Sequence, residues 1–172
     1  QAQAIGDLDN AVVTGFYDMV PELAAKRAEQ FGRKAYSSME ELLADEGVDI
    51  VSICTPSGSH LEPSLAAAAA GKHVMVEKPV EVTTERIDQV ITACNDNGVT
   101  LGAIFPRRFF DTSRLLKAAV EEGRFGTLSL GDVAIKWFRD QAYYDQGGWR
   151  GTWKLDGGGA LMNQGIHGID LI

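Results

Sequence analysis

The sequence has 172 residues, of which 45% are hydrophobic and 23% charged, a composition that favours a globular protein with a hydrophobic core over a disordered or fibrous chain. The formal net charge is −8, with acidic residues scattered along the chain, so a phosphate backbone would be repelled and nucleic-acid binding is not expected. No apolar run approaches the roughly 18 residues that cross a bilayer, which excludes a membrane span.

The N-terminus and the cysteines bear on where the protein works. Residues 1–4 show no basic region followed by an apolar core, so we expect no signal peptide, and the start of the chain resembles a cut inside a longer protein. Cys54 and Cys94 fall in a predicted strand and a predicted helix, without the clustering of a metal site. We therefore predict reduced thiols, no bound metal and a cytoplasmic location.

Short β-branched runs alternate with longer segments of helical period through the first 105 residues. This pattern is typical of repeated βα units around a parallel sheet. The predicted strands are residues 11–17, 49–54, 73–76 and 100–105. The predicted helices are residues 21–31, 61–70, and two that are capped by Ser37 or Ser38 and by Thr83 or Thr84 and run to residues 46 and 97.

After Arg107-Arg108 the pattern changes. A helix is predicted over residues 111–122, followed by a partly alternating strand at 128–138 that suits an antiparallel sheet with one covered face. Three glycines at 157–159 open a last helix that reaches the end of the chain. At about 100 to 200 residues per domain, we predict one domain over residues 1–106 and the beginning of a second over 107–172, each truncated.

Asp18 suggests that a strand precedes the chain. An acidic residue at the end of the second strand of a nucleotide-binding βαβ unit accepts the ribose hydroxyls, about 20 residues after a glycine-rich phosphate loop. Counting back from Asp18 falls before Gln1, so we expect residues 1–6 to be the tail of a first helix and the central strand to lie upstream. The alternative is that Asp18 is an ordinary turn residue.

Polar clusters follow the other strands. They are Thr55 to His60, Glu77-Lys78-Pro79 and Phe105 to Arg108, and open α/β sheets bind their ligands at the carboxyl ends of strands. Each cluster also has a structural interpretation, as turn residues, a helix start or solvated surface charges. Their shared position at one edge of the sheet favours a ligand site.

Together these residues resemble the Gfo/Idh/MocA oxidoreductases, which include glucose-fructose oxidoreductase and inositol dehydrogenases. The motifs that carry the resemblance are the turn from Thr55-Pro56 to His60, the run Gly71 to Pro79, Arg107-Arg108-Phe109, and Gly157-Gly158-Gly159 leading to His167 and Asp170. Residues 148–153 and 163–167 are most similar to the nucleotide-sugar branch, such as UDP-N-acetylglucosaminuronate 3-dehydrogenases.

The resemblance implies an α/β protein with a Rossmann-type doubly wound parallel sheet lacking its first strand, followed by the start of an α+β domain for substrate binding and for dimer or tetramer contacts. The implied cofactor contacts are Asp18, Thr55, Pro56, Ser57, His60, Glu77, Lys78 and Arg108. The implied substrate contacts are Trp149, Arg150, Asn163 and His167. We expect NAD rather than NADP, because the Asp18 carboxylate would repel a 2′-phosphate.

The implied chemistry is oxidation of a secondary alcohol, in which hydride leaves carbon for the nicotinamide while the hydroxyl loses a proton. Such a site needs a base with a pKa near neutral and a cation that holds the developing alkoxide, and we assign these roles to His167 and Lys78. Asn163 lies four residues before His167, on the same face of the predicted helix. The family has Asp there and Asn at Ser57, so both departures bear on activity.

Several alternatives stay open from the sequence. His167 is also suited to a hydrogen bond within a helical core, and Asp170 to a structural role. The glycines at 157–159 fit either a phosphate-binding turn or close helix packing. Aromatic residues near Arg150 fit either sugar stacking or domain packing. At the level of the whole protein, the alternative to a sugar or nucleotide-sugar dehydrogenase is a catalytically silent relative that binds NAD(H).

Overall fold

The computed structural model describes residues 1–172, and its five short strands form two separate parallel sheets. β1 (Gly15–Phe16) pairs with β2 (Lys34–Ala35), while β3 (Ile50–Ile53), β4 (His73–Glu77) and β5 (Leu101–Ile104) form the larger sheet in that order. Parallel neighbours require crossover connections, and a helix lies between most consecutive strands, as the βα alternation predicts.

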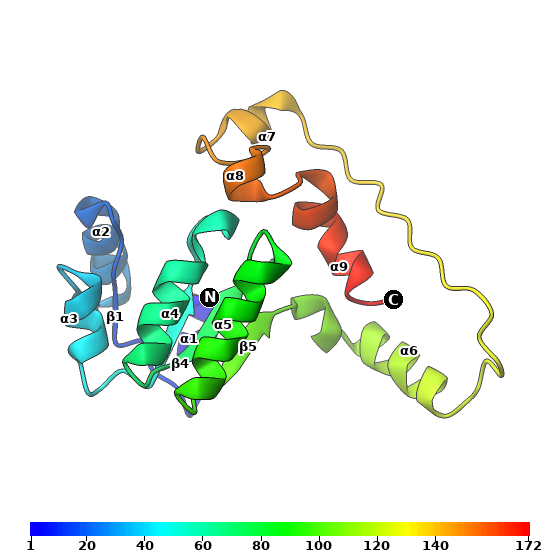
Figure 1. Ribbon diagram of the computed structural model, residues 1–172, viewed down its shortest axis with the longest axis horizontal. Helices are drawn as coiled ribbons and strands as arrows, with labels where there is room; N and C mark the ends of the chain where they lie inside the picture. The colour runs from blue at the N-terminus through cyan, green and yellow to red at the C-terminus, as the bar shows by residue number, and fades with distance from the viewer.

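Helices of the N-terminal part lie between and beside these strands. They are α1 (Ala2–Gly6), α2 (Pro21–Phe31), α3 (Met39–Ala44), α4 (Leu61–Ala69) and α5 (Thr84–Asp96), with a 3₁₀ turn η1 (Ser57–Ser59) after β3 and a second, η2 (Pro106–Phe109), after β5. α4 and α5 pack side by side over the larger sheet (Figure 1).

Two of the predicted caps are confirmed. The Ser38 hydroxyl accepts the Glu41 N–H at 3.1 Å, and the Thr83 hydroxyl accepts the Arg86 N–H at 3.4 Å. Each satisfies a backbone donor that the first turn of a helix leaves without a partner. α2 ends at Gly32, whose φ of 61° is the left-handed conformation that favours glycine there.

The hydrophobic core lies between α4, α5 and the larger sheet. Its members are Ile53, Val74 and Val76 of the strands, Leu61, Ala67 and Ala68 of α4, and Val90 and Cys94 of α5. Small alanine side chains let α4 approach the strands closely, and each fully buried valine contributes roughly 1.5–3 kcal/mol. This core holds the carboxyl ends of β3 and β4 in fixed positions.

The predicted strand at 11–17 is longer than the observed β1, which has two residues. β1 has a hydrogen-bonded neighbour on one side only, β2, and the two sheets do not pair with each other. The other edge of β1 therefore lacks backbone hydrogen bonds. Because such hydrogen bonds extend a strand, β1 stays short.

The C-terminal part consists of short helices joined by a long extended segment. Its helices are α6 (Asp111–Glu121), α7 (Gln141–Asp145), α8 (Trp153–Asp156), the π-helical η3 (Ala160–Gly165) and α9 (Ile166–Ile169). In Figure 1, α6 points away from the sheets, and the segment after it returns to α7, which brings α8 and α9 back over the α/β part. None of the helices is both long and apolar enough to cross a bilayer.

The prediction of a strand at 128–138 is wrong for this structure. These residues are extended but belong to neither sheet, and their side chains are largely exposed, Leu130 and Phe138 each by 85%. A strand forms only where a neighbouring backbone supplies hydrogen bonds, and no such neighbour lies beside this segment.

Candidate active site

The site lies where the C-terminal helices meet the carboxyl ends of β3 and β4. α8 packs directly on η1. Gly58 makes this contact possible, because a Cβ at this position would lie 2.1 Å from the Lys154 carbonyl oxygen. The glycine predicted as a turn residue is therefore required by the close approach of two segments that are almost a hundred residues apart in the chain.

His60 joins the loop after β3 to the loop after β4. Its Nδ1 lies 2.9 Å from the Pro79 carbonyl oxygen and its Nε2 lies 2.9 Å from the Thr55 carbonyl oxygen, and the residue is only 1% exposed. Both ring nitrogens of His60, a residue predicted as a cofactor contact, are thus engaged by backbone carbonyl groups of the protein. Its role here is to fix the two loops.

Glu81, which was not predicted as a site residue, supports the same loops. It is fully buried and accepts the Leu61 N–H at 3.1 Å, the Val82 N–H at 2.7 Å and the Arg86 guanidinium at 3.0 Å. Burial raises the pKa of the Glu81 carboxyl, but Arg86 and the two backbone donors outweigh burial and lower it overall. Glu81 thus stays charged and anchors the start of α4.

Lys78 is the point where the C-terminal part contacts the end of β4. Its Nζ donates to the Asn163 carbonyl oxygen at 2.5 Å and to Asn163 Oδ1 at 3.2 Å. The pKa of Lys78 is lowered because burial disfavours the ammonium, although the negative charges of Glu77 and Asp156 act in the opposite direction. Lys78 and Asn163, which the sequence predicted separately as site residues, are therefore in direct contact.

Asp156 extends this contact into the interior. The carboxylate is 1% exposed, and it accepts Asn163 Nδ2 at 2.8 Å on one oxygen and the Gly151 N–H at 2.7 Å on the other. Sequence reasoning missed Asp156. The available signal was a lone acidic residue directly before the three glycines, at the end of an aromatic segment.

His167 lies on α9 with a buried Nδ1 that has no hydrogen-bond partner. Its pKa is lowered, first by burial and then by the positive charges of Lys78 and Arg107, against the opposing effect of Asp170 and Glu77. A lowered pKa keeps the imidazole neutral near pH 7 and able to accept a proton. His167 therefore has the protonation state that a base needs, and it lies within the electrostatic influence of Lys78.

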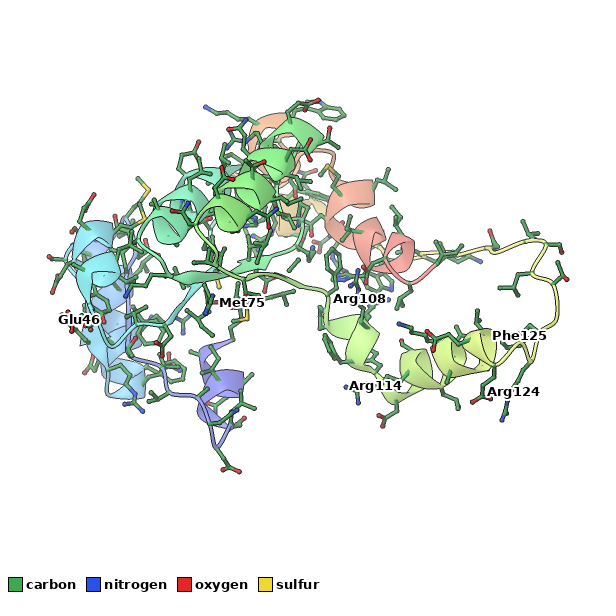
Figure 2. The ribbon with its side chains drawn as sticks, turned by 60° about the horizontal axis from the view of Figure 1, so that its bottom comes forward. Glu46, Met75, Arg108, Arg114, Arg124 and Phe125 are labelled. Atoms are coloured by element: carbon green, nitrogen blue, oxygen red, sulfur yellow. The ribbon has the colours of Figure 1, made fainter.

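Arg108 is bound to Asp170 of α9. Its Nε lies 2.9 Å from both carboxylate oxygens, and a terminal guanidinium nitrogen also contacts one of them. Figure 2 shows Arg108 between the end of β5 and α9. Asp170, whose side chain is 6% exposed, thus has a structural partner. The Arg108 guanidinium, predicted as a cofactor contact, fastens α9 to η2 in this structure.

The other predicted cofactor residues lie at the strand ends or shortly after them. Asp18 is exposed after β1, with one oxygen accepting the Val20 N–H at 2.9 Å. The Thr55 hydroxyl donates to the Ser59 carbonyl at 3.0 Å, and Ser57 follows Pro56 in η1. Glu77 accepts Gln1 Nε2 at 2.6 Å and its neighbour's N–H. A carboxylate and hydroxyls fit the ribose and amide groups of a dinucleotide.

Gly157 has a packing role. Its φ is 73°, and a Cβ there would lie 2.7 Å from the Val82 side chain of the loop before α5. Between the two alternatives for the three glycines, the structure supports close packing at this position. The glycine lets the start of η3 lie against the N-terminal part, which places Asn163 within reach of Lys78.

Three arginines stack on aromatic rings at the outer end of the site. Arg107 lies over Trp137, Arg139 lies over Trp137 and Tyr143, and Arg150 lies over Tyr143 and Trp149, with distances of 4.3–5.8 Å to the ring centroids. We call these six residues the arginine–aromatic cluster. None of its arginines forms a salt bridge.

The cluster is joined to the site through Gln164, whose Nε2 donates to the Tyr143 hydroxyl at 3.2 Å. Gln164 is the neighbour of Asn163, and Arg107 acts electrostatically on His167. Of this cluster the sequence predicted the binding residues Trp149 and Arg150, but not Arg107 or Arg139. No group of three or more His, Cys, Asp or Glu side chains is placed to hold a metal ion.

Comparison with known proteins assigns both parts of the chain. Residues 1–105 match the profile described as an oxidoreductase family with an NAD-binding Rossmann fold, and residues 113–172 match the GFO/IDH/MocA C-terminal domain. Among curated relatives, 1,5-anhydro-D-fructose reductase of Ensifer adhaerens is 34% identical over 81% of this chain and 41% of its own length. Myo-inositol 2-dehydrogenase of Thermotoga maritima is 33% identical over 73% of this chain and 38% of its own.

Solved structures extend the comparison. The WlbA dehydrogenase of Bordetella pertussis, in complex with NADH and UDP-GlcNAcA, is 36% identical with a TM-score of 0.93, over 99% of this chain and 49% of that one. The WlbA dehydrogenase of Chromobacterium violaceum, with the same two ligands, is 38% identical with a TM-score of 0.87, over 92% and 46%. The chain thus spans about half of these structures, and 32–41% of the first curated relatives.

Proposed function

Because this chain belongs to the Gfo/Idh/MocA family of NAD-binding oxidoreductases, we propose that the complete protein oxidises or reduces a secondary alcohol of a sugar, cyclitol or nucleotide-sugar. The observation that carries the proposal is the contact of Lys78 with Asn163 beside His167, which has a buried, unpartnered Nδ1. A cation next to a neutral imidazole is the pair that alcohol oxidation needs. This pairing favours the enzyme over the catalytically silent relative.

The two parts of the chain would have different roles. Residues 1–106 would hold the cofactor, and residues 107–172 would begin the substrate domain, a division in keeping with the two matched profiles. A cytoplasmic location and a dimer or tetramer complete the proposal. The location rests on the resemblance and on the two free cysteines, and the oligomeric state rests on the resemblance alone.

We assign the cofactor-binding roles from the positions of these residues at the strand ends. Asp18 would accept the ribose hydroxyls, which favours NAD because a carboxylate repels a 2′-phosphate. Between the ribose at Asp18 and the nicotinamide at Lys78, the cofactor would contact Thr55, Ser57 and Glu77. When bound, NAD supplies the nicotinamide C4 that takes the hydrogen of the carbinol carbon together with its electron pair.

The chain's own residues would handle the proton. In the oxidation direction, His167 accepts the hydroxyl proton while the Lys78 ammonium holds the oxygen as negative charge develops on it. The alcohol becomes a ketone, and the proton stays on the imidazole until solvent takes it. In reduction the same groups act in reverse, with His167 as the acid. Asn163 orients Lys78 and the substrate hydroxyls through its amide.

A finer proposal concerns the substrate, which we infer to be anionic. The arginine–aromatic cluster holds three guanidinium groups without carboxylate partners, in a chain whose net charge is −8. One of them, Arg107, acts electrostatically on His167. Guanidinium groups bind carboxylate and phosphate bidentately. A nucleotide-sugar carries such groups, and the WlbA structures contain UDP-GlcNAcA. Arg150 and Trp149 would contact this part of the substrate.

The test is turnover by the complete protein. NADH formation is followed by absorbance with a panel of inositols, neutral sugars, UDP-sugars and UDP-sugar uronates. We expect turnover, with the highest kcat/KM for an anionic nucleotide-sugar. A protein that binds NADH but turns over no member of the panel in either direction is the silent relative instead.

A further inference from the structure

We propose that Asp156 is a positioning residue for this reaction: from the protein interior it orients the Asn163 amide and thereby holds the charged Lys78 in place. The proposal rests on the proposed function, since it concerns the group that holds the substrate oxygen. It gives a role to a buried carboxylate that would not itself contact the reacting atoms.

Asp156 is a charged group in an unusual setting. It is 1% exposed and has no cation within salt-bridge distance. Burying a carboxylate without a paired cation is costly unless hydrogen bonds compensate. Its two side-chain hydrogen bonds, to Asn163 Nδ2 and the Gly151 N–H, are both from neutral donors. The nearest positive charge along this network is Lys78, reached through Asn163.

The side-chain amide of Asn163 carries an oxygen and an NH₂ group, and Asp156 determines which of the two faces Lys78. The NH₂ group donates to Asp156 at 2.8 Å, so the amide oxygen faces the Lys78 ammonium at 3.2 Å. In the flipped orientation the amide oxygen would face a carboxylate and the NH₂ group would face an ammonium, and both contacts would be repulsive. The carboxylate therefore fixes the side of the amide that Lys78 meets.

Asp156 also contributes negative charge that the neutral Asn163 does not have. The charged groups that act on Lys78 are Glu77 from β4 and Asp156 from α8. Lys78 in turn acts on the titratable His167 of α9. Glu77 and Asp156 oppose the fall of the Lys78 pKa that burial causes. Removing one of these two carboxylates should lower that pKa further.

The second oxygen of Asp156 links Lys78 to the substrate-binding loop. It accepts the Gly151 N–H at 2.7 Å, and Gly151 directly follows Arg150, which stacks on Tyr143 and Trp149. One carboxylate thus holds both the residue that would meet the reacting oxygen and the loop that would bind the substrate's anionic group.

The test is the Asp156→Asn variant of the complete protein, assayed across pH in the oxidation direction. The acid limb of kcat/KM belongs to His167, which must be neutral, and the alkaline limb belongs to Lys78, which must be charged. We expect kcat to fall about tenfold or more and the alkaline limb to move down by about one pH unit. The acid limb stays in place, because Asp156 is not among the groups that shift His167.

A charge exchange separates this role from a purely structural one. In the double variant Asp156→Asn/Asn163→Asp, the carboxylate moves from position 156 to position 163, which contacts Lys78 directly. The network keeps its net charge. We expect it to restore the alkaline limb and most of kcat. Asp88→Asn, at an exposed position of α5, is the matched control and should match the parent.

Each result decides the proposal. It is overturned if Asp156→Asn keeps the parent's kcat and both limbs, or if kcat falls while the alkaline limb stays in place. If Asp156→Asn does not fold, as judged by melting and NADH binding, the double variant decides through the position of its alkaline limb. A parent protein that turns over no substrate disproves the proposed function instead, and that is a separate result.

Discussion

Lys78 is the residue where the two parts of the chain meet. It directly follows β4 in the N-terminal part and donates two hydrogen bonds to Asn163, 85 positions further along the chain. Burial lowers its pKa and that of His167. Near neutral pH the His167 imidazole is therefore neutral, and the oxygens of Asn163 hold the Lys78 ammonium beside β4.

We predict that Lys78→Met and His167→Ala each lower kcat at least about 100-fold, because one removes the cation on the substrate oxygen and the other removes the base. NADH affinity should change little. Steady-state kinetics and a fluorescence titration with NADH measure the two effects. Retention of activity by both variants would contradict the roles given to these residues.

At the scale of elements, the packing of α8 on η1 determines whether the site forms. α8 carries Asp156, whereas η1 begins with Ser57 and lies just after Thr55. Only a glycine at position 58 permits the contact, since a Cβ would lie 2.1 Å from a backbone oxygen that has little freedom to move. The same glycine thus supports both cofactor and substrate residues.

We expect Gly58→Ala to lower the free energy of unfolding by about 1–3 kcal/mol through overpacking. It should also lower kcat, because α8 must shift away from η1 and take Asp156 with it. Urea denaturation and steady-state kinetics check these effects in parallel. Gly102→Ala in β5 is the control, since its Cβ would lie 3.9 Å from the nearest atom. Equal stability and kcat in the two variants would refute the packing argument.

At the scale of the whole molecule, the charge distribution is uneven. The chain carries a net charge of −8, yet Arg107, Arg139 and Arg150 gather without carboxylate partners on the aromatic rings of one cluster. A local positive site on an acidic protein attracts an anionic ligand while the rest of the surface repels it. This distribution suits a charged substrate better than a neutral cyclitol.

We predict that Arg150→Gln raises KM for an anionic nucleotide-sugar about tenfold or more, because a hydrogen bond to a charged group contributes about 1.5–3 kcal/mol. KM for a neutral sugar should hardly change. Added salt should raise the parent's KM for the anionic substrate by screening. Arg33→Gln, on the exposed surface, is the matched control. Equal effects of Arg150→Gln on charged and neutral substrates would argue against an anion site.

The sequence by itself determined the βα order and the placement of Lys78 and its neighbours at strand ends. It also limited each of two N-caps to a pair of neighbours, Ser37 or Ser38 and Thr83 or Thr84. These features depend on local periodicity, on turn chemistry and on a specific family pattern, all of which can be read within a few residues. The same patterns mark four candidate site residues without any knowledge of contacts: Asp18, Lys78, Asn163 and His167.

Only the tertiary structure decided which candidate residues contact one another and which are already engaged in hydrogen bonds or ion pairs within the protein. The links from Lys78 to Asn163 and from Asn163 to Asp156, the engagement of both His60 nitrogens, and the Arg108–Asp170 pair join residues from different elements. No local pattern encodes such pairs, because they depend on where distant segments come to lie. For the same reason residues 128–138, strand-like by pattern, form no strand: a strand requires a neighbour.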